Sequence, residues 1–254
     1  METGIEIEFK DVWKHFPGNE QPTLSGLNLV CKKGDINVII GYSGTGKSVT
    51  IKHLLGLMTP DQGEVWVKSK NMSALKDVEK RDLRNYFGML FQSSALFDGL
   101  NVFDNIAFPI REHNKKIKDK VLKDKVFELL EQVDLEGSHF KMPSELSGGM
   151  KKRVGLARAI ALNPDILICD EPTTGLDPVT SRLIDQLIVK TTKSIGATAF
   201  IISHDIHAAV DIADSITMLH GGKNIATHTP GNITKTESKV LQEFLDCAGV
   251  ERKS

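Results

Sequence analysis

The chain has 254 residues, of which 40% are hydrophobic and 26% are charged, and its formal net charge is −1. This is the composition of an ordinary globular protein, long enough for one large domain or two small ones. The near-neutral charge gives no electrostatic indication of nucleic-acid binding. Three widely spaced cysteines fit a reducing compartment and match neither a metal-binding spacing nor a disulfide framework.

The ends and apolar runs of the sequence bear on membrane association. The first six residues are acidic, whereas a signal peptide would begin basic and then become apolar. No apolar stretch approaches the roughly 20 residues that span a bilayer. We therefore expect a soluble protein, which other chains would have to hold at a membrane.

The N-terminal segment alternates apolar and polar residues over 5–10 and again over 24–33, with a turn at 17–19. Alternation of this kind predicts half-exposed strands, and hence a small antiparallel sheet. Phe16 lies between the two runs. It is either part of the core or an aromatic that stacks on a nucleotide base, and its position alone does not decide between the two.

A phosphate-binding loop is predicted at 41–48. The segment fits the pattern G-x-x-x-x-G-K-[ST] at every fixed position, and it follows an apolar strand at 36–40 and precedes a helix at 48–55. Glycines allow the backbone to direct several N–H groups toward one anion. Lys47 would reach the β- and γ-phosphates of a nucleotide, and the hydroxyl of Ser48 would bind Mg²⁺.

The middle of the chain is predicted to be a helical insert at about 93–145 within an α/β core. A buried strand over 87–92 ends in Gln92, a candidate site residue because ligands bind at the carboxyl ends of parallel strands. The apolar segment 96–108 is either core or a groove for a partner's helix. A charged helix follows at 115–133. The basic runs 115–116 and 151–153 are interpreted as solvated helix faces.

Two further motifs point to phosphate chemistry. Ser147 precedes two glycines at the start of a helix, and this arrangement predicts an N-cap and a second anion seat. A second seat is redundant within one subunit, so we expect it to complete a nucleotide site on another subunit. The strand over 166–171 ends in Asp170, a candidate for the Mg²⁺ shell, and Glu171, a candidate for polarising the attacking water.

The last third of the chain supplies two more candidates. Asp177 is predicted to cap a helix whose first residue is Pro178. His204 follows a strand over 198–203, where a contact with the γ-phosphate is expected. A hairpin at 216–226 and a tail helix at 238–248 complete the prediction, and Cys169 is expected to be a small core residue.

Together these motifs resemble the ATP-binding subunits of ABC (ATP-binding cassette) transporters over nearly the whole chain. Many nucleotide-hydrolysing proteins carry the phosphate loop, and it is the run Leu146-Ser147-Gly148-Gly149-Met150 that singles out this family. The resemblance implies one ABC domain over 1–254, an α/β fold of the P-loop NTPase class. It would have a RecA-like mixed core, an N-terminal antiparallel β subdomain, a helical subdomain at 93–145 and a helical tail at about 229–254.

The resemblance also implies ATP and Mg²⁺ as cofactors and assigns roles to residues. Glu171 would be the catalytic carboxylate, assisted by Gln92, and His204 would contact the γ-phosphate. Ser48, Gln92 and Asp170 would surround Mg²⁺. ATP would be held by Phe16 on the adenine and by the loop residues Gly41, Tyr42, Ser43, Gly44, Thr45, Gly46, Lys47, Ser48 and Val49. In a homodimer, Ser147, Gly148 and Gly149 would bind the partner's ATP, and Asp177 would lie at the seam.

Two positions depart from the common family pattern. Threonine is frequent where this chain has Val49, and glutamine is frequent where it has Met150. Both lie beside contacts that the backbone or neighbouring residues make. Neither departure therefore puts ATP binding in doubt.

Segments 89–97, 101–113 and 142–145 resemble the Mla-type branch, which energises phospholipid movement between bacterial inner and outer membranes. This implies an integral membrane permease docking near 94–108, a lipid-binding partner protein, and a peripheral location on the cytoplasmic face of the inner (plasma) membrane. One alternative is an ABC transporter for another solute. Another is a soluble ABC ATPase switch, which the single cassette, the lack of a long coiled coil and the charge disfavour. We expect no nucleic acid as a partner.

Overall fold

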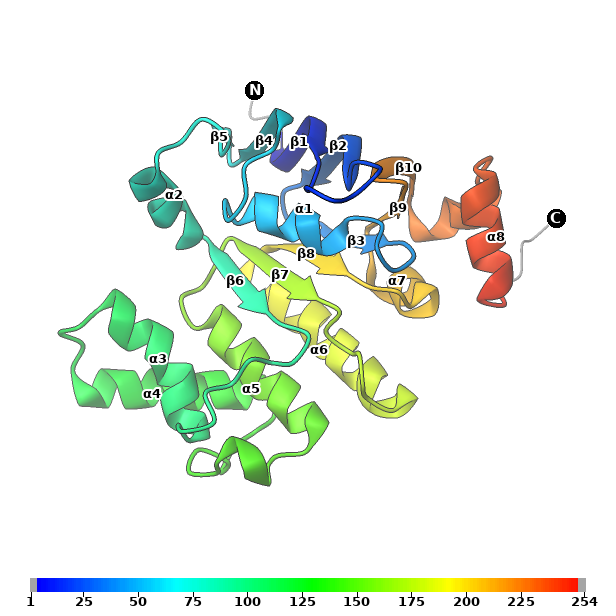
Figure 1. Cartoon of the computed structure of the whole chain (residues 1–254). Helices are drawn as coiled ribbons and strands as arrows, with labels where there is room; N and C mark the ends of the chain where they lie inside the picture. The colour runs from blue at the N-terminus through cyan, green and yellow to red at the C-terminus, as the bar shows by residue number, and fades with distance from the viewer. Residues whose placement is uncertain (1–3, 251–254) are drawn as a thin grey trace. The chain divides into compact units, whose positions relative to one another are not determined.

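The computed structural model describes residues 4–250, which form two units (Figure 1). Unit 1 comprises 4–84 together with 198–250, and unit 2 is Asn85–Ala197. The strand before the phosphate loop lies in unit 1, and the strand that ends at Asp170, directly before Glu171, lies in unit 2. Each unit therefore carries its own share of the predicted site residues.

Unit 1 begins with the antiparallel sheet that the sequence predicts. Its strand order is β2-β1-β4-β5. Ile7 pairs with Cys31 and Phe9 with Leu29, and all four side chains are buried, so the alternation predicted from the sequence is confirmed. The strands are β1 (Ile5–Lys14), β2 (Leu24–Lys32), β4 (Gln62–Val67) and β5 (Lys70–Asn71).

The second sheet portion of unit 1 is centred on β3 (Ile36–Ile40), which runs parallel to β8 (Thr198–Ile202) and β9 (Ser215–His220). Every residue of β3 and β8 is buried, as expected for strands covered on both faces. The predicted hairpin is present, because β9 pairs with β10 (Lys223–His228). The helices of this unit are α1 (Lys47–Leu54), α2 (Asp77–Arg84), α7 (Ile206–Ile212), η2 (Pro230–Lys235) and α8 (Lys239–Cys247).

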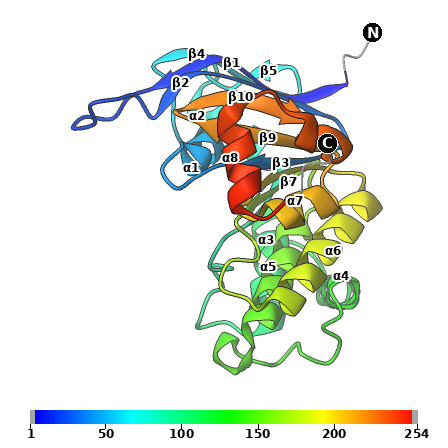
Figure 2. The same cartoon turned by 90° about the vertical axis from the view of Figure 1, so that its right-hand side faces the viewer.

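The tail helix α8 packs on its own unit. The ring of Phe244 meets the ring of Tyr42, a phosphate-loop residue, edge-on at a centroid distance of 5.2 Å. The carbonyl of Ala248 lies 2.8 Å from Nε2 of His207 in α7, and Figure 2 shows α7 and α8 close together. The C-terminal helix is thus placed beside the phosphate loop of the same chain.

Unit 2 combines two parallel strands with a set of helices. β6 (Phe87–Leu90) pairs with β7 (Ile166–Asp170), from Phe87 beside Ile166 to Leu90 beside Cys169. Cys169 is fully buried, so its predicted core role is confirmed. Helix α5 contacts α3, α4, α6 and β6 and is the centre of the unit. The helices are α3 (Val102–His113), α4 (Asp119–Gln132), η1 (Pro143–Glu145), α5 (Gly148–Ile160) and α6 (Pro178–Ile195).

Some boundaries and elements differ from the prediction. The charged helix begins at Asp119, not at 115, because Asn114 ends α3 and its side chain accepts a bond from the amide of Lys116, which forms a turn. The strand predicted over 87–92 ends at Leu90, which places Gln92 in the following loop. The short helices α2 and α7 were not predicted. No helix within residues 4–250 is long and apolar enough to cross a bilayer.

Candidate functional site

The phosphate loop of unit 1 has a backbone that requires glycine at two of its positions. Gly41 has φ +156° and Gly46 has φ +99°. A Cβ added to Gly41 would lie 2.5 Å from the carbonyl oxygen of Leu219, and one added to Gly46 would lie 2.9 Å from that of Thr23. The loop therefore combines positive φ angles with close approach to neighbouring backbone.

Lys47 occupies the inside of this loop. It is only 7% exposed, and its Nζ donates to the carbonyls of Gly41 at 2.8 Å and Tyr42 at 2.9 Å. Ser48, the next residue, is exposed in the first turn of α1. The N-cap residue of α1 is Gly46, which has no side chain to bond the first amides of the helix, and these amides can therefore bind an anion.

A hollow of about 530 Å³ adjoins the loop within unit 1. It is lined by the loop residues 42–45, by the β1–β2 connection at 19–23 and by 220–222 of the β9–β10 turn. Phe16, just beyond β1, is half-buried with the ammonium of Lys14 5.9 Å from its ring, and it is not among the lining residues. The role of Phe16 in adenine stacking stays a prediction.

His204 belongs to the same unit. It is exposed in the connection between β8 and α7, two residues beyond the end of the strand. Asp205 caps α7 by accepting from the amides of His207 and Ala208 at 2.9 and 3.1 Å. The cap fixes the backbone immediately after His204.

In unit 2 the structure brings Gln92 and Glu171 together. Glu171 follows the end of β7 with φ +46°, a left-handed conformation that is uncommon outside glycine. Its Oε2 accepts from Oγ1 of Thr174 at 3.0 Å and lies 3.4 Å from Nε2 of Gln92. Thr174 was missed by the sequence reasoning, although it lies only three residues beyond Glu171.

The predicted second anion seat has the expected helix cap. Oγ of Ser147 accepts from the amide of Met150 at 3.3 Å, and α5 begins at Gly148. A Cβ on Gly149 would lie 2.7 Å from Cγ2 of Thr180 on α6, so the start of α5 approaches α6 closely. Ser147 and Gly148 are exposed.

Asp177 caps α6 as predicted. Its Oδ1 accepts from the amides of Val179 and Thr180 at 3.1 and 3.0 Å. Hydrogen bonds from Thr180 and Val179 hold the pKa of the Asp177 carboxyl below its usual range. Asp177 therefore presents a stable negative charge at the surface of unit 2.

The interpretation of 151–153 as a solvated basic face is wrong at Lys152. This residue is 5% exposed, and its Nζ donates to the backbone carbonyl of Gln92 at 2.5 Å. Burial lowers the pKa of Lys152, and the nearby Glu171 carboxylate acts in the opposite direction. The burial of Lys152 could not be read from the sequence, because consecutive residues of a helix point to different sides of it. Arg153, for example, donates to the carbonyl of Val133 at 2.9 Å.

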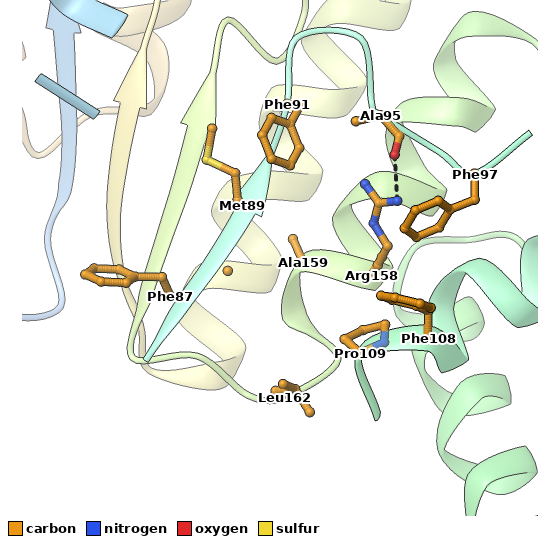
Figure 3. Close-up of a pocket in the computed structure, with 11 residues that line it drawn as sticks. Phe87, Met89, Phe91, Ala95, Phe97, Phe108, Pro109, Arg158, Ala159 and Leu162 are labelled. Atoms are coloured by element: carbon orange, nitrogen blue, oxygen red, sulfur yellow. Dashed lines mark hydrogen bonds between the residues drawn. The ribbon is translucent and has the colours of Figure 1, made fainter. Parts of the chain in front are cut away.

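An apolar groove of about 300 Å³ opens on unit 2 (Figure 3). Phe91, Phe97 and Phe108 border it, each about two-fifths exposed, and the rings of Phe97 and Phe108 are 4.8 Å apart. Arg158 of α5 also lines it. Segment 96–108 contributes to the core through the fully buried Val102 and Ile106 and to the groove through Phe97 and Phe108, and a partner's helix in the groove stays a prediction.

The residues predicted to hold Mg²⁺ are a hydroxyl, an amide and a carboxylate, at Ser48, Gln92 and Asp170. Oxygen donors of these types fit a hard divalent cation that keeps part of its water shell. Within residues 4–250 no group of three or more His, Cys, Asp or Glu side chains is clustered as a metal site. The donor set of the prediction is thus of the right chemistry for Mg²⁺ together with phosphate oxygens.

Comparisons with known proteins extend this description. Residues 24–174 match the family described as "ABC transporter". The MlaF protein of Haemophilus influenzae, an intermembrane phospholipid transport system ATP-binding protein, is 39% identical over 94% of this chain and 89% of its own length. The protein of the same name in Escherichia coli K12 is 36% identical over 94% and 88%. The Mycobacterium leprae protein mkl, named for ribonucleotide transport, is 39% identical over 97% and 70%.

Solved structures also resemble the chain. The ATP-binding cassette MJ0796, in a dimeric post-hydrolysis state bound to ADP and Pi, aligns with a TM-score of 0.80 and 30% identity, covering 88% of this chain and 98% of that one. The cbiO1 protein from Clostridium perfringens, part of the ABC transporter complex cbiONQ, aligns with a TM-score of 0.84 and 27% identity, covering 95% of each chain.

Proposed function

The chain belongs to the ABC transporter family as an Mla-type ATP-hydrolysing subunit, and we propose that it powers a membrane permease that moves phospholipid between the two membranes of a bacterial envelope. The observation that carries the substrate assignment is the similarity to the two MlaF proteins, which are named for intermembrane phospholipid transport and align with 94% of this chain. The ATPase assignment rests on the family itself.

For ATP binding, we assign the triphosphate to the loop 41–48. Two features support this: Lys47 is directed into the loop, and the first turn of α1 has no side-chain cap. Phe16 stacks on the adenine, and Val49 lies next to the loop in α1. Ser48, Gln92 and Asp170 hold Mg²⁺, which neutralises phosphate charge when it is bound.

For hydrolysis, Glu171 is the carboxylate that orients and polarises the attacking water. Its bonds to Thr174 and Gln92 fix the direction of its carboxylate. His204 donates to the γ-phosphate. In this proposal the chain acts as a single ABC domain.

The second anion seat completes the ATP site of a partner copy in a homodimer. The exposed Ser147 and Gly148, together with Gly149, contact that ATP, and Asp177 lies at the seam. An interface of this kind is isologous, because each copy contributes its second anion-binding site to the ATP bound by the other copy. The dimeric state of the similar cassette MJ0796 supports the proposal.

The groove of unit 2 receives a helix of the permease, near residues 94–108. Its exposed phenylalanines and apolar walls suit the apolar face of a helix. Docking there places the chain on the cytoplasmic face of the inner membrane as a peripheral subunit, with a lipid-binding protein as a further partner.

The similarity to mkl favours a second candidate function, in which the transporter carries a ribonucleotide. Purification of the native complex in mild detergent, with mass spectrometry of its proteins and small molecules, separates the two. We expect a permease, a lipid-binding protein and enriched phospholipid. Enriched ribonucleotide without specific lipid would overturn the substrate assignment, and the absence of any membrane partner would overturn the transporter assignment in favour of a soluble switch.

A further inference from the structure

Two cations on one side of α5 bind the backbone of the loop that carries Gln92. Nζ of Lys152 donates to the carbonyl of Gln92 at 2.5 Å, and Nη1 and Nη2 of Arg158 donate to the carbonyls of Ala95 and Ser94, each at 2.8 Å. Bonds from charged donors are stronger than neutral ones, and the planar guanidinium is well suited to two acceptors at once. Three bonds to the carbonyls of Gln92, Ser94 and Ala95 thus fasten the loop 92–95 to α5.

The fastened segment has an unfavourable backbone. Ser94 and Ala95 have φ values of +62° and +44°, although neither is glycine, and Ser94 is 2% exposed. Left-handed conformations at consecutive non-glycine residues persist only where surrounding contacts enforce them. The two bonds from Arg158 fall on these two residues.

Gly155 allows the loop to come this close to the helix. It lies midway between Lys152 and Arg158, and three-residue steps bring these positions to successive turns on one side of α5. A Cβ added at Gly155 would lie 3.4 Å from Cβ of Ser94 and 3.0 Å from Cδ1 of Leu90. At Gly155, between Lys152 and Arg158, α5 therefore has no side chain, and the loop 92–95 packs against the helix there.

The fastened loop connects two functional regions of unit 2. At one end, the side chain of Gln92 lies 3.4 Å from Oε2 of Glu171. At the other end, the guanidinium of Arg158 lies 5.6 Å from the ring of Phe97 and lines the apolar groove (Figure 3). The same α5 begins at Ser147, the cap of the proposed seat for the partner's ATP.

From this geometry we propose that Lys152 and Arg158 are positioning residues for hydrolysis. They hold loop 92–95 so that the Gln92 side chain stays directed at Glu171. The proposal rests on the proposed roles of Gln92 and Glu171. Neither cation touches the nucleotide in this proposal, so their loss should slow the chemical step without weakening ATP binding.

The test replaces each cation in the full chain by methionine, which keeps an unbranched apolar stem and removes the donors. Lys152→Met and Arg158→Met should lower kcat by about 10- to 100-fold with little change in the KM for ATP, the size expected when a catalytic group is displaced by a fraction of an ångström to an ångström. The conservative variants Lys152→Arg and Arg158→Lys keep a cation and should recover part of the rate.

The matched control is Arg153→Met. Arg153 lies on the same helix and also donates to a backbone carbonyl, that of Val133, away from loop 92–95. The Arg153→Met variant should lower the melting temperature about as much as Arg158→Met does, while leaving kcat near the wild-type value. A kcat for Arg158→Met equal to that of Arg153→Met, or a loss expressed in KM alone, would overturn the proposal.

Hydrogen–deuterium exchange gives a second readout that needs no turnover. Arg158→Met should raise exchange of the amides at 92–97, and Arg153→Met should raise it near 133–135 instead. Faster exchange at 92–97 with unchanged kcat would reject the positioning role, as would unchanged exchange there. A wild-type chain that does not hydrolyse ATP, alone or with its membrane partners, would instead refute the proposed function.

Discussion

Nε2 of Gln92 lies 3.4 Å from Oε2 of Glu171, and these residues are 79 positions apart in the chain. The Glu171 carboxylate also accepts a bond from Thr174. Of these two partners, Gln92 belongs to the loop whose residues Phe91 and Ala95 line the apolar groove. Replacing Gln92 by alanine should lower kcat by about tenfold or more, because the residue orients Glu171 and the Mg²⁺ shell, whereas ATP affinity measured without Mg²⁺ should change little, because the loop 41–48 holds the triphosphate. Parallel measurement of ATP affinity and steady-state hydrolysis checks this. A loss of affinity with unchanged kcat would contradict it.

Lys47→Ala should abolish most ATP affinity. In the proposed site the buried ammonium of Lys47 is the main protein cation for the phosphates, so its removal leaves the triphosphate charge without that partner. Titration with a fluorescent ATP analogue measures the effect. Lys52→Ala, which removes an exposed lysine from the same helix, is the control and should bind normally.

Because His53 is buried, the free energy of unfolding should decrease in mild acid. Its ring is 1% exposed, with Nδ1 2.8 Å from the carbonyl of Val49 and no partner for Nε2 among the described residues. Burial is the largest cause that lowers the pKa of His53 below its ordinary value of 6.5. As the pH falls below 6.5, the unfolded chain takes up the proton first, so the folded state loses stability until its own pKa is reached.

Urea unfolding at pH values from about 7 to about 5 tests this contribution. The decrease in the free energy of unfolding should be smaller in His53→Leu than in the wild type. The exposed His113 serves as a comparison, and His113→Leu should retain the wild-type slope. Equal slopes in all three proteins would exclude His53 as a source of the acid sensitivity.

Phe97→Ala should weaken association with the permease. Phe97 is 42% exposed at the groove, so the substitution removes contact area for the helix proposed to dock there, together with the contact between its ring and Phe108. Co-purification with the membrane subunits measures the loss. Phe140→Ala removes a ring that is 79% exposed and does not line the groove, and it should co-purify normally. Equal retention of both variants would place the docking surface elsewhere.

Local sequence rules predicted much of this fold. The loop at 41–48, the caps at Ser147 and Asp177 and the hairpin after β9 all depend on residues within a few positions of one another. Such features follow from φ restrictions and capping chemistry, which a sequence displays directly. The ATP-site residues were predicted from their characteristic spacing, and their roles stay predictions.

Other features depend on contacts between distant positions. The fastening of loop 92–95 joins residues 60 to 64 positions apart, so Lys152 looked like one of three solvated cations. The packing of Phe244 on Tyr42 spans most of the chain, and the sequence left the position of the tail helix open. Helix α2 was missed because it has only two buried residues and hence a weak apolar pattern.

In the proposed mechanism, two copies of the chain enclose ATP, and Glu171 polarises the water that attacks it. The most direct measurement is the mass of Glu171→Gln in solution with Mg²⁺ and ATP, by light scattering, alongside its rate of hydrolysis. We expect a stable dimer that hydrolyses ATP at least about 100-fold more slowly than the wild type, because the water is no longer polarised. A monomer under these conditions, or hydrolysis at the wild-type rate, would contradict it.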